Sequence, residues 1–168
     1  MRHRFIITLG SAVALLSAAC GRQNSAPAVE AQPDEKLHWL SDFDVAKTQA
    51  RTQSKTLLIN FTGSDWCPPC IMLFRQVFSQ PEFADYAAKN LVLLEVDFPH
   101  TKGQSDEQKA ANEKLAERYG IYGFPTVIVL DSSGKKTGEL GYMRGGPQAF
   151  IAALEKLRGG DGTKTPLR

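Results

Sequence analysis

Residues 65–70 have the sequence Asp-Trp-Cys-Pro-Pro-Cys and lie between two largely apolar segments of different period. Upstream, residues 57–61 form a short apolar run, which predicts a buried strand. Downstream, the apolar residues between 71 and 78 share one helical face, which predicts a helix. The Cys67 and Cys70 pair therefore lies where a strand turns into a helix, with Cys67 at the helix N-terminus.

This position favours an ionised and accessible sulfur at Cys67. The unpaired N–H groups and the positive dipole end of a helix N-terminus stabilise an anion, so we expect the pKa of Cys67 to lie below that of a free thiol. A thiolate is the form that attacks a disulfide. Cys70, one turn further on, is near enough to close a ring onto Cys67. Pro68 and Pro69 lack N–H groups, which removes up to two donors and tempers the expected fall in pKa.

The composition is that of an ordinary globular protein. The chain has 168 residues, 42% of them hydrophobic and 23% charged, which is consistent with a single folded domain. The net charge of +2 comes without a clustered basic face, so a nucleic-acid partner is not expected. Only three cysteines are present, which excludes a scaffold of several disulfides. Residue 71 is Ile, so the Cys-x-x-Cys-His haem attachment is absent.

Residues 1–19 are predicted to be an export signal, with basic residues first, an apolar stretch at 5–16 and small residues last. The apolar stretch is too short to span a bilayer, which needs about 20 residues. The small residues before Cys20 resemble a bacterial lipoprotein signal, which implies that Cys20 is lipidated, although Ser17 stands where that family favours leucine. The alternative is ordinary cleavage that leaves Cys20 as a free thiol. The resemblance to a lipoprotein signal also implies that Gly21, after the cysteine, argues against retention at the inner membrane and so favours the outer one.

The rest of the chain divides into a tether, a folded domain and a tail. Residues 20–35 are polar, contain prolines and show no apolar period, which predicts a disordered tether. Residues 36–158 are expected to fold, and residues 159–168 are a polar tail that we expect to be flexible. The strands expected in the folded domain are 37–40, 57–61, 91–98 and 127–130 with a hairpin return through 140, and the helices are 42–53, 68–78, 79–89, 105–119 and 147–157.

This order of elements predicts an α/β domain. Strands and helices alternate first, and a hairpin and a closing helix follow, which implies a central mixed β-sheet with helices on both faces. Two capping boxes are expected, Ser79 with Glu82 and Ser105 with Gln108, because Ser followed three residues later by Glu or Gln satisfies free N–H groups at a helix start.

Two motifs in this order resemble the thioredoxin family. One is Trp66-Cys67-x-x-Cys70 after a strand, and the other is Gly123-Phe124-Pro125-Thr126 before the hairpin and the closing helix. The resemblance covers residues 37–158 and implies a thioredoxin fold. The stretches 61–66 and 77–81 are similar to the periplasmic thiol:disulfide interchange branch typified by the C-terminal domain of DsbD.

The resemblance also implies roles for individual residues. Cys67 and Cys70 are the catalytic, redox-active couple. The bond between Phe124 and Pro125 is expected to be cis and to face the two sulfurs, so that the Phe124 backbone can pair with an extended substrate segment. Trp66 is expected to form part of the surface on which substrates dock.

One departure from the family concerns the proton of Cys70. The family's buried acid falls near Asn60 if one residue is inserted in the following loop, and an amide cannot accept the proton as a carboxylate can. Asp65, Glu95 or water then has to serve, and the sequence leaves these alternatives open.

The function that the sequence favours is a thiol–disulfide oxidoreductase of the bacterial cell envelope, on its periplasmic side, that reduces protein disulfides. We expect disulfide-containing proteins as substrates, a membrane or soluble thiol protein as electron donor, a lipid anchor, a monomer, and no cofactor or metal. Disulfide isomerase or oxidase activity, a copper- or haem-handling binding module, and a docking lipoprotein with a merely stabilising bridge are the alternatives. The histidines of the exported chain, His38 and His100, are not spaced as metal ligands.

Overall fold

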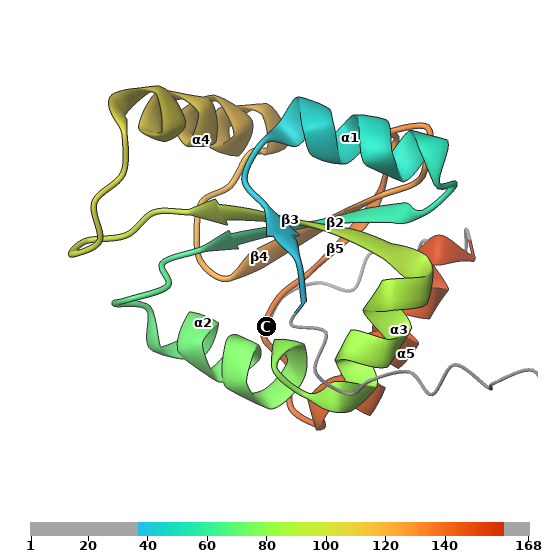
Figure 1. Cartoon of the computed structure of the whole chain (residues 1–168). Helices are drawn as coiled ribbons and strands as arrows, with labels where there is room; N and C mark the ends of the chain where they lie inside the picture. The colour runs from blue at the N-terminus through green and yellow to red at the C-terminus, as the bar shows by residue number, and fades with distance from the viewer. Residues whose placement is uncertain (1–36, 160–168) are drawn as a thin grey trace, which may run out of the picture. The chain divides into compact units, whose positions relative to one another are not determined.

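The computed structural model describes residues 37–159, which form a five-stranded sheet with helices on both faces (Figure 1). The expected signal peptide (1–19), the lipidation site Cys20, the tether (20–35) and all of the tail beyond Gly159 lie outside the described residues. Within 37–159, every helix is too short or too polar to cross a bilayer.

The elements follow the predicted order. They are β1 (Trp39–Leu40), α1 (Phe43–Thr52), β2 (Thr56–Thr62), α2 (Pro68–Leu73), the π-helix η1 (Phe74–Phe78), α3 (Pro81–Asn90), β3 (Leu91–Asp97), α4 (Asp106–Tyr119), β4 (Thr126–Leu130), β5 (Lys136–Leu140) and α5 (Gly146–Arg158). The strand order in the sheet is β1-β3-β2-β4-β5. β3 pairs parallel with β1 and β2, whereas β4 pairs antiparallel with β2 and β5. The expectation of a mixed sheet is therefore confirmed.

The central strand β2 explains why both faces of the sheet carry helices. All seven of its residues are buried, and neighbouring side chains point to opposite faces. Leu58 joins a core cluster with Phe83 of α3 and Phe150 of α5. Ile59 joins a second cluster with Leu115 of α4. Figure 1 shows α2, α3 and α5 on one side of the sheet, and α1 and α4 on the other.

One of the two expected capping boxes is confirmed at its cap, and the other is wrong. The N–H of Gln108 donates to Ser105 Oγ at 3.2 Å at the start of α4. The Ser79 hydroxyl instead donates to the carbonyl of Arg75 at 2.9 Å, and Gln80 is the N-cap residue of α3. The side-chain amide of Gln80 donates to the same carbonyl at 2.6 Å. The widened turn of η1 leaves the Arg75 carbonyl without a regular helical donor. Ser79 therefore donates to this carbonyl instead of capping α3.

Candidate active site

Cys67 and Cys70 are joined by a disulfide at the start of α2, with their Cα atoms 5.3 Å apart. Cys67 is the N-cap residue of α2, and Cys70 lies in its first turn. The turn after β2 is closed by the backbone, because the N–H of Cys67 donates to the carbonyl of Gly63 at 2.9 Å. This short turn brings the pair to the end of the sheet where β2 ends.

The expectation that the pair is accessible is wrong for this oxidised state. Each cysteine is only 4% exposed. Each sulfur covers part of the other in the disulfide, and the tight turn onto Gly63 draws Cys67 back toward the sheet. A thiol that reduces this disulfide therefore has to approach a sulfur that is almost covered, which favours an extended segment over a globular surface.

The start of α2 offers few N–H donors to the Cys67 sulfur. Pro68 and Pro69 occupy its first positions and have no N–H group. The first helical N–H belongs to Cys70 and donates to the Cys67 carbonyl at 3.0 Å. The first turn also contains no acidic residue, so no neighbouring negative charge in it opposes a thiolate. The helix dipole is therefore the main local contribution from α2 that favours ionisation of Cys67.

The segment of Phe124 and Pro125 lies at the same end of the sheet. The peptide bond between these residues is cis, as predicted. They immediately precede β4, whose first residue, Thr126, pairs with Phe61 near the end of β2. Because the cysteine-bearing turn follows β2 directly, this register places Phe124 and Pro125 beside it. Both are partly exposed.

Trp66 is held in place by contacts on two sides. Its indole Nε1–H donates to the carbonyl of Phe98 at 2.8 Å, and its ring stacks on His100 with centroids 4.4 Å apart. Phe124 meets it edge-on at 6.0 Å. A Cβ at Gly63 would lie 2.5 Å from the indole, so only glycine allows this close approach. The ring is still 40% exposed. From the sequence, His100 was expected at most as a metal ligand, and this stacking on Trp66 was not predicted.

Asp65 ties the cysteine-bearing turn to a distant loop. Its carboxylate accepts hydrogen bonds from the hydroxyl of Thr101 and from the backbone N–H groups of His100, Thr101 and Lys102. The Thr101 hydroxyl, followed by the N–H groups of His100 and Thr101, holds the pKa of Asp65 well below its usual range. This lowered pKa makes the Asp65 carboxylate a weak base and therefore a poor proton acceptor for Cys70.

Further hydrogen bonds fasten the same loop beside the site. Ser64 donates to Asp97 through its N–H at 2.9 Å and through its hydroxyl at 2.6 Å. Lys102 donates in turn to the Ser64 hydroxyl oxygen at 2.8 Å. The loop and Trp66 border a small open cavity of about 220 Å³, lined by Trp66, Phe98, Pro99, His100, Lys102, Gln104, Lys109 and Glu113.

Two polar residues lie within the sheet on the side covered by α2. Asn60 is 4% exposed, and its Oδ1 accepts no hydrogen bond from any described residue. Glu95 is its partner in the β2–β3 register and is half-buried. Burial, and then the charge of Asp97, raise the pKa of Glu95, while Lys102 opposes this rise. Within 37–159, no group of three or more His, Cys, Asp or Glu residues is arranged to hold a metal ion.

The structure thus brings together five of the six predicted site residues at one end of the sheet. They are Cys67, Cys70, Trp66, Phe124 and Pro125; the sixth, Cys20, lies outside the described residues. The anchoring role of Asp65 and the contact of Trp66 with His100 were not predicted from the sequence. The acidic residue beside Trp66 was a signal for the first, but its partners are 35 or more residues away along the chain.

Comparison with known proteins agrees with this site. The thioredoxin-like domain family matches residues 43–158. The disulfide bond reductase DsbH of Chlamydia pneumoniae is 34% identical over 125 residues, which cover 73% of this chain and 75% of that protein. The thiol:disulfide interchange protein DsbD of Cronobacter sakazakii is 28% identical over 139 residues, which cover 81% of this chain but only 22% of that protein.

A solved structure of a DsbH oxidoreductase superposes with a TM-score of 0.69 at 32% identity, over 73% of this chain and 84% of that one. The shared sequence and architecture, together with the Cys67–Cys70 disulfide, show a thioredoxin fold and a thiol–disulfide oxidoreductase. The chain belongs to the thioredoxin-like family.

Proposed function

We propose that the protein reduces disulfide bonds of proteins in the bacterial cell envelope through a Cys67/Cys70 dithiol. The observation that carries this proposal is the disulfide at the start of α2, beside the Phe124–Pro125 segment and a partly exposed Trp66. The reductive direction is supported by the similarity to a protein named as a disulfide bond reductase.

The reaction has two exchange steps. In the dithiol form, the Cys67 thiolate attacks one sulfur of the substrate disulfide, and the other substrate sulfur leaves with the electron pair of the broken bond. The Cys70 sulfur then attacks Cys67, breaks the mixed disulfide and releases the second substrate sulfur. Two electrons pass from the protein to the substrate, and an electron-donating thiol protein, membrane-bound or soluble, restores the dithiol.

Substrate binding is assigned to Trp66, Phe124 and Pro125. The partly exposed rings of Trp66 and Phe124 form an apolar border, and the backbone of Phe124 is positioned to pair with an extended strand of the substrate. Because the pair itself is nearly covered, a substrate segment that lies along this border is well placed to bring its disulfide to Cys67.

The cellular location follows from the N-terminal sequence. We assign residues 1–19 as a lipoprotein-type signal peptide, Cys20 as the lipidated residue and residues 20–35 as a tether to the folded domain at 36–158, with 159–168 as a tail. A flexible tether of this length reaches roughly 20 Å. The proposed location is the periplasmic side of a membrane, the outer one favoured, with the protein acting as a monomer.

Trapping of substrates tests the function. A Cys70→Ala variant retains the attacking sulfur but cannot resolve the mixed disulfide, so it should accumulate adducts with envelope proteins that dissolve on reduction. The matched control is the double variant Cys67→Ala/Cys70→Ala, which should trap nothing. Absence of adducts from the Cys70→Ala variant would contradict the catalytic role of Cys67.

The direction of the reaction is tested by the reduction potential of the couple. Related proteins range from about −270 mV for reductants to about −120 mV for oxidants, a difference of about 7 kcal/mol for two electrons. A value near the reducing end supports the reductase. A value near the oxidising end would instead assign an oxidase or isomerase. The anchor is tested separately, since Cys20→Ser should abolish incorporation of labelled palmitate.

A further inference from the structure

The order of residues along β2 and α2 places Cys70 on the face of the sheet that carries Asn60, at the same level along β2. Leu58 packs in one core cluster with Leu73 at the end of α2. α2 runs back along β2 after the turn, so a later residue of β2 faces an earlier residue of α2 (Figure 1). Asn60 lies two residues after Leu58, and Cys70 lies one helical turn before Leu73 on the same buried side.

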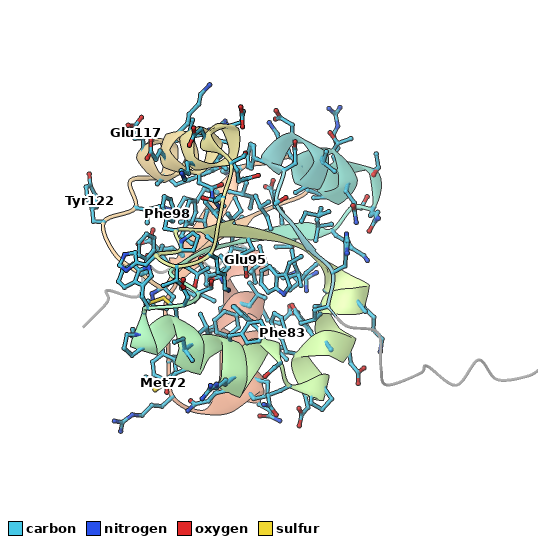
Figure 2. All side chains as sticks on the ribbon, turned by 60° about the vertical axis from the view of Figure 1, so that its left-hand side comes forward. Met72, Phe83, Glu95, Phe98, Glu117 and Tyr122 are labelled. Carbon is cyan, nitrogen blue, oxygen red and sulfur yellow. A yellow bond between two sulfur atoms is a disulfide. The ribbon has the colours of Figure 1, made fainter. Side chains whose placement is uncertain are left out.

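Glu95 belongs to the same row and the same side of the sheet. It pairs in register with Asn60, and the parallel pleat of β2 and β3 points both side chains to one face. Figure 2 shows Glu95 on the side of the sheet that faces α2, the side on which the yellow sulfur–sulfur bond is drawn. A carboxyl group and an amide with a free acceptor oxygen therefore lie next to each other beneath the start of α2.

The chemistry of the second exchange step needs such a group. Cys70 attacks as a thiolate, so its thiol must first lose a proton, and at 4% exposure it has little direct access to water. Asp65, the carboxylate nearest in sequence, is already occupied by Thr101 and by the N–H groups of His100 and Lys102. Glu95 is half-buried, and within residues 37–159 its carboxylate accepts no hydrogen bond of this kind.

We propose that Glu95 accepts the proton of Cys70 in the second exchange step and that Asn60 Oδ1 then accepts the hydrogen bond of the protonated carboxyl. This inference rests on the dithiol chemistry proposed above. The Cys70 thiolate attacks the Cys67 sulfur, and the bond from Cys67 to the substrate sulfur breaks. The electron pair leaves with the substrate sulfur, which takes up a proton from Glu95 or from solvent.

The surroundings of Glu95 favour the protonated form of its carboxyl. The charged groups that act on Glu95 are Asp97, two residues further along β3, and Lys102. α2 carries no charged residue, and the one charge on η1 belongs to the exposed Arg75. Burial and Asp97 together shift the pKa of Glu95 upward, toward the range in which proton transfer to and from a thiol is efficient.

A chromogenic aromatic disulfide, 5,5′-dithiobis(2-nitrobenzoate), separates the two steps. Reduced protein releases one coloured thiolate when Cys67 attacks and a second when Cys70 closes the ring. We expect Glu95→Gln to slow the second release about 100-fold below pH 7 and to make its rate rise with pH, because hydroxide or water must then take the proton. The first release should change less than threefold.

Relocating the carboxyl gives the decisive variant. The double variant Asn60→Asp/Glu95→Gln places the acid on the neighbouring strand and should restore most of the second-step rate. Glu117→Gln, on the exposed surface of α4, is the matched control and should leave both steps unchanged. Equal slowing of both releases, or an unchanged pH profile of the second in Glu95→Gln, would overturn the inference. Absence of the first release in the wild type would instead refute the dithiol function.

A measurement on the wild type covers the case in which Glu95→Gln does not fold. The carboxyl carbon of Glu95, followed by NMR in the reduced protein, should titrate above the ordinary range of a glutamate and shift again when Cys70 ionises. A carboxyl that titrates near 4.3 without any response to Cys70 would overturn the proposal.

Discussion

At the scale of single residues, two prolines define the environment of the Cys67 sulfur. Pro68 and Pro69 fill the first positions of α2 and are well suited to them, because the N–H groups there have no helical partner. Because neither proline has an N–H group, two hydrogen-bond donors that would otherwise point toward a Cys67 thiolate are absent. The thiolate form of Cys67 is thus stabilised by the helix dipole but by few hydrogen bonds. Its ability to act as a leaving group is therefore moderate.

Replacing Pro69 with alanine should make Cys67 more acidic. The new N–H group points toward the sulfur and stabilises its anion, so we expect the pKa of Cys67 to fall by about 0.5–1 unit. The pH dependence of alkylation by iodoacetamide measures this pKa. Pro81→Ala, at the start of α3, is the matched control and should leave it unchanged. An unaltered pKa in Pro69→Ala would show that this N–H does not reach the sulfur.

At the scale of elements, the loop that follows β3 belongs to the active site through Asp65. The carboxylate gathers N–H groups from three successive residues, His100, Thr101 and Lys102, while Trp66 covers Phe98 and His100. The loop and the cysteine-bearing turn therefore hold each other in place. A substitution in the loop is therefore expected to alter the mobility of the cysteine-bearing turn, and the reverse.

Asp65→Asn should loosen this loop. The lowered pKa of Asp65 means that its contribution to stability is present above the unfolded value of about 4 and is lost as the pH falls through its lower folded value. Between pH 5 and 7 the variant should therefore show faster amide hydrogen exchange at Thr101 and Lys102 than the wild type. Asp131→Asn, in the β4–β5 turn, is a control that should not affect these amides. Equal exchange rates would contradict the anchoring role.

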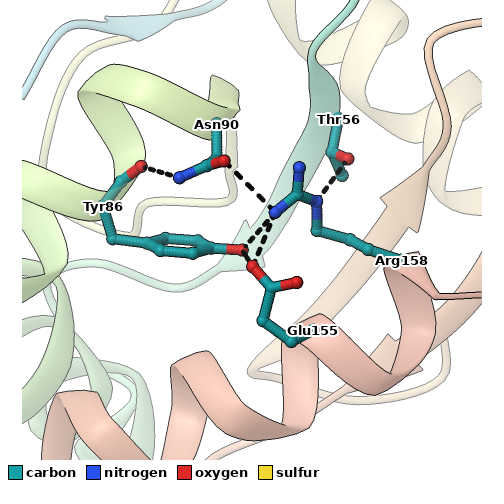
Figure 3. A network of polar contacts seen from close by, with 5 residues as sticks. All are labelled: Thr56, Tyr86, Asn90, Glu155 and Arg158. Atoms are coloured by element: carbon teal, nitrogen blue, oxygen red, sulfur yellow. Dashed lines mark hydrogen bonds and ion pairs between the residues drawn. The ribbon is translucent and has the colours of Figure 1, made fainter.

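A second polar network joins α3, α5 and β2 far from the cysteines (Figure 3). Arg158 donates to Thr56 at 3.1 Å, to Tyr86 at 2.8 Å and to Glu155 at 2.6 Å, with a longer bond to Asn90. Burial, and then the hydrogen bond to Glu155, raise the pKa of Tyr86 to about 12, so the phenol keeps its proton at physiological pH.

Arg158→Ala should weaken this junction without affecting the redox site. Partly buried acceptors lose their charged donor, and we expect the free energy of unfolding to fall by about 1–3 kcal/mol. Urea denaturation of the oxidised protein measures the change. Arg51→Ala, an exposed residue in the last turn of α1, should change it by less than about 0.5 kcal/mol. A similar effect of both substitutions would argue against a specific network.

Local patterns in the sequence were enough to predict most of these elements. The apolar runs around Cys67 and Cys70 and the Ser105 cap depend on neighbours within a few residues, and the structure confirms them. The partners of Asp65 and the pairing of Asn60 with Glu95 depend on strand register and on a loop 35 residues away, which periodicity does not encode. The burial of the cysteines is likewise a tertiary property.

At the scale of the whole domain, redox state and stability are linked. In a strongly oxidising thiol–disulfide oxidoreductase, the folded state is more stable in its reduced form. In a reducing one, the folded state is more stable with the disulfide formed. For the proposed reductase we therefore expect the oxidised protein to be more resistant to urea than the reduced one. Each 30 mV by which the reduction potential of the folded protein lies below that of the unfolded couple corresponds to about 1.4 kcal/mol of extra stability of the oxidised form over the reduced form. A more stable reduced form would contradict the reductive direction.

The edges of the sheet bear on how closely copies of the protein can crowd together. β1 has only two residues, and β5 carries the ion pair of Lys136 and Glu139 together with a bulge against β4. Neither edge offers a long flat row of free N–H and C=O groups, which is the feature that lets one sheet recruit a strand from another. Molecules concentrated on a single surface would therefore collide without joining their sheets, and aggregation into fibrils is disfavoured.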